Sequence, residues 1–140
     1  MYYDFVAHCR WPFAPIAERS SATWLWTGLR EIFGSALAAA LMPNHLHVVA
    51  PTPDPQIELD RLRHLLGAYA RVFGVGWNRI PDPKPLVTID KLVRQVRYIA
   101  LNPCRPVRVG TESIVLVRDP LLWEWSTHRD AIGAPSSIPG

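Results

Sequence analysis

The chain has 140 residues, of which 49% are hydrophobic and 19% are charged. This length fits one domain and excludes two cores of normal size, and the hydrophobic content excludes a disordered chain. The net charge of +3 hints at an anionic partner, and 13 of the 15 basic residues are arginines, whose planar forks match phosphate oxygens. A genomic preference for Arg, Ala and Pro codons explains the arginines equally well.

The two cysteines, Cys9 and Cys104, exclude a disulfide framework and a zinc site made of cysteines alone. The first four residues contain no basic segment of the kind that opens a secretory signal. The longest apolar run, residues 33–42, is too short to cross a bilayer. We therefore expect a cytoplasmic protein with no membrane segment.

The first half of the chain alternates strand and helix patterns. Residues 2–9 are aromatic and β-branched and predict a strand, and Ser20 or Ser21 is a suitable cap for a helix that runs to about Phe33. Residues 36–42 form a buried strand or a buried helix, because their alanines leave the type open. After turn chemistry at residues 42–44, residues 45–50 predict another strand.

The second half begins with an amphipathic helix over residues 57–73, which Gly74 and Gly76 should end. Asp90 is a plausible N-cap for a further helix over residues 91–101, which Pro103 prevents from continuing. Three weaker segments remain: a short strand at 86–89, an edge strand at 114–117 and a closing helical turn at 121–130.

The element order strand-helix-strand-strand-helix-strand, followed by a helix, predicts an α+β fold of the ferredoxin-like, split βαβ type. Such a sandwich has an antiparallel sheet with helices packed on one face, here with an additional C-terminal helix. We expect one domain over residues 1–130 and a flexible tail over 131–140. This fold hosts many functions, so the function must be argued from particular residues.

His45 and His47 lie two residues apart on a predicted strand, so both imidazoles should share one face while Leu46 turns to the other. Two converging imidazoles can bind a divalent metal ion. By itself the pair is a weak signal, because most such pairs are incidental surface residues.

Tyr98 and Asn102 are four residues apart at the end of the last predicted helix and should share a face. A phenol is a potential nucleophile, and an amide oxygen is a potential metal ligand. By spacing alone, a tyrosine packed on the sheet and an asparagine at a helix end are the favoured explanation.

Basic residues surround this helix, and Glu112 is the only acidic residue between positions 91 and 118. The basic residues are Lys91, Arg94, Arg97, Arg105, Arg108 and Arg118. A basic stretch flanking a candidate nucleophile suits an enzyme that acts on phosphodiesters. A solvated helix face is the simpler explanation for Arg94 and Arg118.

Three blocks of sequence together resemble the signature blocks of the REP-associated tyrosine transposases, which belong to the HUH (His-hydrophobe-His) superfamily of single-strand transposases. The blocks are Met42-Pro43-Asn44-His45-Leu46-His47-Val48-Val49, Tyr98-Ile99-Ala100-Leu101-Asn102-Pro103-Cys104-Arg105, and Asp119-Pro120 with Trp123-Glu124-Trp125-Ser126-Thr127-His128-Arg129. The first two blocks are specific as a pair, in this order and at this separation. The chain departs from the family at residues 81–85, where a proline-rich run replaces a longer Gly/Gln/Arg-containing segment.

The resemblance implies cleavage and rejoining of single-stranded DNA next to a hairpin, through a 5′-phosphotyrosine intermediate. It implies that Tyr98 is the nucleophile and that His45, His47 and Asn102 bind Mg²⁺ or Mn²⁺. We expect Arg97, Arg105 and Arg108 to contact the DNA backbone. Relatives include monomers and homodimers, so both states remain open.

Three alternatives remain. A non-catalytic module that binds single-stranded nucleic acid would show aromatic side chains on the central strands, where this chain has histidines. A non-catalytic protein of this kind that derives from such a transposase stays open. A hydrolase of small phosphoesters would usually place carboxylates beside the histidines. A replication nickase shares the histidine pair, but 140 residues leave no room for a helicase domain.

Overall fold

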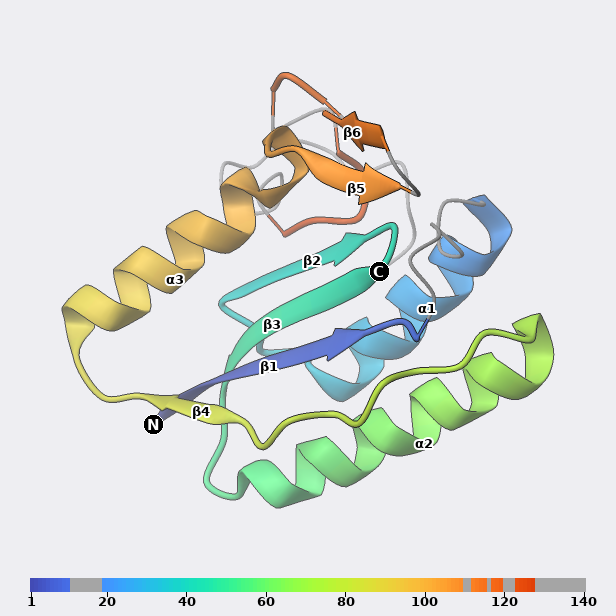
Figure 1. Ribbon diagram of the computed structural model, residues 1–140. Coiled ribbons are helices and arrows are strands. Elements are labelled where there is room, and N and C mark those ends of the chain that lie inside the picture. Colours follow the sequence, from blue (N-terminus) through green and yellow to red (C-terminus); the bar gives the residue numbers. More distant parts are fainter. Residues whose placement is uncertain (11–18, 110–111, 116, 120–122, 128–140) are drawn as a thin grey trace.

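The computed structural model describes residues 1–10, 19–109, 112–115, 117–119 and 123–127 (Figure 1). The tail expected over 131–140 lies outside this range. No helix in these described segments combines the length and the apolar character needed to cross a membrane.

A four-stranded antiparallel sheet forms the centre of the fold. Its strands are β1 (Tyr2–His8), β2 (Ala38–Met42), β3 (His45–Pro51) and β4 (Lys84–Leu86). Their spatial order is β2-β3-β1-β4, with β1 and β3 adjacent in the middle. After β1 the chain passes through a helix and β2 before it returns as β3, which pairs with β1. This is the ferredoxin-like arrangement, so the predicted α+β class is confirmed.

Helices cover both faces of this sheet. They are α1 (Arg19–Ile32), α2 (Pro55–Phe73) and α3 (Ile89–Leu101), the last continued by a 3₁₀ turn, Asn102–Cys104. In Figure 1, α1 and α2 lie together on one face, and α3 lies on the other. The helix that carries Tyr98 therefore approaches the sheet from the side that α1 and α2 leave open.

The residues of β3 divide between these two faces because successive side chains of a strand point in opposite directions. Leu46 and Val48 are fully buried in the core formed with α1 and α2. His45 and His47 take the intervening positions and face α3. The predicted opposition of Leu46 to the two histidines is thus confirmed.

The segment whose type the sequence left open is strand β2. All five of its residues are buried, because β2 pairs with β3 and has packing partners on both faces. Ala38 and Ala40 face α3, where their small side chains let Ile99 of that helix pack closely. A buried strand of this kind lacks the alternation of apolar and polar residues by which strands are recognised.

Two predicted helix starts were wrong. Helix α3 begins at Ile89, and its N-cap is Thr88, whose hydroxyl accepts a hydrogen bond from the Lys91 backbone at 3.2 Å. Asp90 lies in the first turn, where a negative charge favours the helix dipole. Ser20 and Ser21 lie inside α1 rather than ahead of it.

The end of α2 follows the prediction. Gly74 caps the helix with a φ of 72°, a left-handed conformation that glycine adopts without a steric penalty. The short strand expected at 86–89 is also present, but it is shifted to Lys84–Leu86 because its residues pair with β1.

The C-terminal predictions were wrong in detail. A small hairpin forms from β5 (Val107–Val109) and β6 (Glu112–Ile114), instead of one strand over 114–117. The described residues 123–127 are not helical; Ser126 forms a bridge to Ala40 of edge strand β2. The Trp123 indole also donates to the Leu41 carbonyl at 2.8 Å. This segment covers part of the edge strand, whose backbone groups would otherwise be exposed.

Candidate active site

The two histidines of β3 lie side by side on the face that α3 covers. Their ring centroids are 5.2 Å apart, and the rings are almost perpendicular, at 88°. His8 of β1 stacks on His45 at 5.0 Å, because these two residues are directly opposed in the register of β1 and β3. Three imidazoles therefore lie along one face of the central strands.

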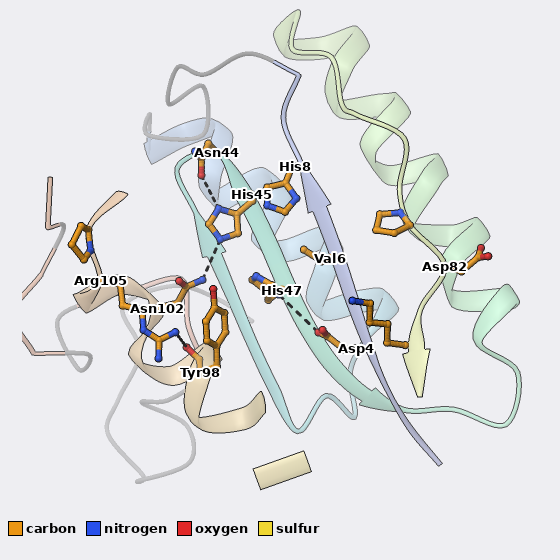
Figure 2. Close-up of a pocket in the computed structure, with 13 residues that line it drawn as sticks. Asp4, Val6, His8, Asn44, His45, His47, Asp82, Tyr98, Asn102 and Arg105 are labelled. Carbon is orange, nitrogen blue, oxygen red and sulfur yellow. Dashed lines mark hydrogen bonds and ion pairs between the residues drawn. The ribbon is translucent and has the colours of Figure 1, made fainter. Parts of the chain in front are cut away.

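Hydrogen bonds fix the orientation of the His45 ring between two asparagines. Its Nδ1 lies 2.7 Å from Oδ1 of Asn44, and its Nε2 lies 3.1 Å from Nδ2 of Asn102 (Figure 2). An amide oxygen can only accept, so Nδ1 carries the proton and donates to Asn44. Nε2 then carries the lone pair, which accepts a hydrogen bond from the Asn102 amide here and is the lone pair that a metal ion would use.

The environment of His45 favours the neutral ring. Burial, together with charge repulsion from the neighbouring His47 and His8, lowers its pKa to about 3. The pKa of His8 is lowered by the same causes, burial first and His47 second. Because of this low pKa, the His45 ring stays neutral well below neutral pH, and a neutral imidazole has a lone pair that can bind a cation.

The lowered pKa of His45 predicts a pH dependence of stability. The unfolded chain binds a proton near pH 6.5 and the folded chain only near pH 3, so acid favours unfolding across this window. We expect the metal-free protein to lose more thermal stability between pH 7.5 and pH 4.5 than the variant His45→Gln. Thermal melts in EDTA test this. Both proteins contain the same carboxylates, so the difference between their losses of thermal stability reports on His45. An equal loss in both would contradict the assignment.

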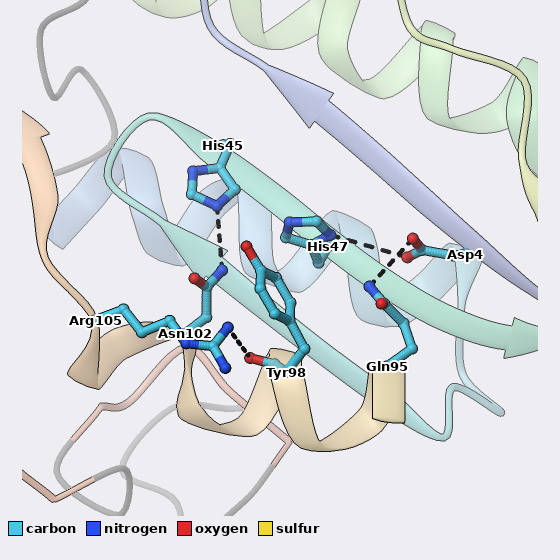
Figure 3. Close-up of polar contacts among 7 residues, drawn as sticks. All are labelled: Asp4, His45, His47, Gln95, Tyr98, Asn102 and Arg105. Carbon is cyan, nitrogen blue, oxygen red and sulfur yellow. Dashed lines mark hydrogen bonds and ion pairs between the residues drawn. The ribbon is translucent and has the colours of Figure 1, made fainter. Parts of the chain in front are cut away.

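Tyr98 extends from α3 toward the two histidines. Its side chain is 40% exposed, and its ring meets the His47 ring edge-on at 5.6 Å between centroids. Figure 3 shows the hydroxyl directed at the space between His45 and His47. The Arg105 guanidinium lies over the Tyr98 ring at 4.1 Å and donates to the Tyr98 carbonyl at 3.5 Å. The phenol is thus held between an imidazole and a cation.

The packing of α3 explains why Tyr98 and Asn102 reach the histidines. Ile99 is fully buried against β2 and β3, which fixes the rotation of the helix. Tyr98 and Asn102, four residues apart, then share the face directed at β3. Asn102 is only 5% exposed, so its amide is enclosed at the end of the helix.

These side chains line a cavity of about 500 Å³ that opens to solvent (Figure 2). Its wall consists of Asp4, Val6, His8, Asn44, His45, His47, Pro81, Asp82, Lys84, Tyr98, Asn102, Arg105 and Pro106. The proline-rich connector, where the sequence departs from the transposase pattern, supplies Pro81, Asp82 and Lys84 to one side of it.

The structure brings together five of the seven residues that the sequence singled out. His45, His47, Tyr98, Asn102 and Arg105 line the same cavity. One other basic residue is placed differently. Arg97 lines a separate groove on α3 with five apolar residues. Arg108 lies on β5, opposite Ser113 of β6.

Sequence reasoning missed the contribution of β1 to the cavity. Asp4 and His8 project from the face of β1 that also carries Val6, while Phe5 and Ala7 enter the core. The signal was present in the sequence: two polar residues alternate with buried apolar ones in a predicted strand.

The two histidines of β3 can bind a divalent cation if a side-chain amide provides a third ligand. Within the described segments, no group of three His, Cys, Asp or Glu side chains is placed to bind a metal ion together. A site at this position therefore needs the Asn102 amide beside His45 and His47. Asn102 directs its nitrogen at Nε2 of His45 here, and a half-turn of the amide would present its oxygen.

Comparison with known proteins supports the fold assignment. No protein-family model matches the chain, and no curated protein sequence does. A solved structure of a REP-associated tyrosine transposase bound to a REP hairpin is similar, with a TM-score of 0.69 and 16% sequence identity. The match covers 99% of this chain and 85% of the other. The chain therefore has the fold of a REP-associated tyrosine transposase, as its signature blocks indicated.

Proposed function

We propose that this protein is a metal-dependent strand transferase that cleaves and rejoins single-stranded DNA next to a hairpin, with Tyr98 as its nucleophile. One observation carries the proposal: the Tyr98 hydroxyl is directed at the space between His45 and His47, in an open cavity that Asn102 borders. A nucleophile and a potential cation site are thus side by side where a strand can enter.

His45, His47 and Asn102 would bind Mg²⁺ or Mn²⁺. All three are neutral ligands, so the ion would keep its full charge for the substrate. When bound, such an ion polarises a phosphate oxygen and stabilises the charge that develops on it.

The protein residues supply the nucleophile and its orientation. The Tyr98 oxygen loses its proton as it attacks the phosphorus, and the bond from phosphorus to the 3′ oxygen breaks. The 3′ oxygen takes up a proton, so the strand upstream leaves with a free 3′-OH. The phenol has a reference pKa near ~10, so it needs a favourable electrostatic setting at neutral pH. Arg105 contributes a positive charge against the Tyr98 ring. The phosphotyrosine retains the energy of the phosphoester, so another 3′-OH can reverse the reaction and join strands without ATP.

The position of the nucleophile favours a single strand as the substrate. Tyr98 lies on a helix packed firmly against the sheet, so the DNA must bend to present a phosphate in line. A single strand bends easily, whereas a stacked duplex resists. The similar transposase structure is bound to a REP hairpin, which supports a hairpin as the element that gives shape and register.

A covalent adduct tests the proposal. Labelled single strands that carry a hairpin are incubated with the protein and Mn²⁺, and the products are separated under denaturing conditions. We expect a protein–DNA adduct that EDTA prevents. Tight binding of these strands with no adduct in either Mg²⁺ or Mn²⁺ would reject cleavage and favour a non-catalytic protein that binds single-stranded nucleic acid.

Arg105 provides a prediction for DNA affinity. Its guanidinium lines the cavity, so Arg105→Ala should remove one phosphate contact. The slope of log affinity against log salt should then fall by about 0.7 for a single strand. Gel-shift titrations at several salt concentrations measure this, with Arg61→Ala as the control, because Arg61 is exposed on α2 across the sheet. Equal slopes in both variants would contradict the proposed contact of Arg105 with DNA. Equal affinity of the parent protein for hairpin strands and for plain duplex would contradict a single-stranded substrate.

A further inference from the structure

Asp4 of β1 forms an unusual contact with His47. Its Oδ1 lies 3.9 Å from Nδ1 of His47, and the two side chains are only 13% and 12% exposed. Both atoms are buried, and neither has a hydrogen-bond partner among the described residues. Buried polar atoms without a partner are costly, so two such atoms that face each other call for an explanation.

The other carboxylate oxygen of Asp4 is already bonded. Gln95 of α3 donates from Nε2 to Oδ2 at 3.2 Å (Figure 3). Gln95 precedes Tyr98 by three residues, about one turn of the same helix. Asp4 therefore lies between the helix of the candidate nucleophile and the ring of a candidate metal ligand.

We propose that Asp4 is a positioning residue that holds the proton of His47 on Nδ1 and directs Nε2 into the cavity. This inference rests on the proposed function, in which His47 binds a cation. A carboxylate facing Nδ1 favours a proton there, because that nitrogen can then donate to it. The opposite nitrogen keeps its lone pair, and metal-binding histidines commonly have such an outer partner.

The remaining gap between Asp4 and His47 is small. A distance of 3.9 Å is too long for a hydrogen bond, but a modest ring rotation would close it. Asp4 cannot bind the same ion directly, because its oxygen faces the nitrogen on the side of the ring away from Tyr98 (Figure 3). Because Gln95 and Tyr98 lie on the same helix, the bond from Gln95 to Asp4 would also fix the position of Tyr98 relative to His47.

Asp4→Asn is the test, because it preserves shape and replaces one oxygen by an amide nitrogen. The first readout is the His47 tautomer of the metal-free protein, from the ¹⁵N shifts of its ring. We expect the proton on Nδ1 in the parent protein and loss of this preference in Asp4→Asn. The second readout is Mn²⁺ affinity without DNA, which should fall by about 10–100-fold. Asp60→Asn is the matched control, since Asp60 is 67% exposed and pairs with Arg63 on α2.

The outcomes separate this inference from the proposed function. An unchanged tautomer and unchanged Mn²⁺ affinity in Asp4→Asn would overturn the role of Asp4, whatever the DNA chemistry. A parent protein that does not bind Mn²⁺ would reject the metal site, and with it the positioning role. If Asp4→Asn fails to fold, Gln95→Ala replaces it: this variant keeps the carboxylate but frees it, and should weaken Mn²⁺ binding in the same direction. Unchanged Mn²⁺ affinity in Gln95→Ala would then count against the inference.

Discussion

Tyr98→Phe is expected to abolish the covalent protein–DNA adduct while leaving hairpin binding almost unchanged. The substitution removes only the hydroxyl, and the remaining ring can still meet His47 and lie beneath Arg105. Tyr98 is 40% exposed, so the free energy of unfolding should change by no more than about 0.5 kcal/mol. Denaturing gels measure the adduct, and gel shifts measure binding.

Tyr3→Phe is a suitable control for this variant. Tyr3 lies on β1 but packs against the core formed with α1 and α2, so its hydroxyl is not part of the cavity. It should form the adduct normally. Strand cleavage at the parental rate by Tyr98→Phe would reject a tyrosine nucleophile and point to hydrolysis by water.

The second large effect is expected from His47→Ala, which should abolish adduct formation and greatly weaken Mn²⁺ binding. The proposal gives the ion three protein ligands, so the loss of one imidazole removes a third of them. Stability should change little, because the ring borders the cavity and not the apolar core. Mn²⁺ titration, adduct yield and thermal melting measure the three quantities.

His64→Ala is the control for His47→Ala. His64 is an exposed residue of α2, where Nδ1 of its ring hydrogen-bonds to the Asp60 carbonyl at 3.0 Å. It should retain both Mn²⁺ binding and cleavage. A His47→Ala variant that forms the adduct as well as His64→Ala would contradict the proposed metal site.

The elements that bear the site were predictable because they depend on local periodicity. Alternation along a strand predicted that His45 and His47 share one face of that strand. Helical spacing predicted that Tyr98 and Asn102 share one face of a helix. The contact between Asp4 and His47 was not predictable, because it joins residues of two different strands.

Sequence patterns failed where tertiary pairing decides the structure. A cap at Asp90 has the right chemistry, but Thr88 takes that role, since β4 ends just before it. Residues 123–127 were predicted to be part of a closing helical turn, yet their backbone bonds to β2 determine their conformation. A pattern of charges could not reveal that Arg97 lies in a groove apart from Tyr98.

The third signature block has a structural explanation in this fold. Leu41 donates a backbone hydrogen bond to the Trp125 carbonyl at 2.8 Å, and Thr127 donates to Ala39 at 2.9 Å. These bonds extend the sheet beyond β2, the strand against which α3 packs. The block therefore supports the site by bracing the sheet, and none of its described residues lines the cavity.

The central claim is that Tyr98 attacks a phosphate and keeps the 5′ end of the cleaved strand. The most direct measurement uses two hairpin-bearing single strands, one labelled at its 5′ end and one at its 3′ end, incubated with the protein and Mn²⁺. We expect only the 3′ label to become attached to protein and the 5′ label to appear in a shorter strand with a free 3′-OH. Mass spectrometry should find the nucleotide on Tyr98. Attachment of the 5′ label, attachment at another residue, or release of both fragments without any adduct would contradict the central claim.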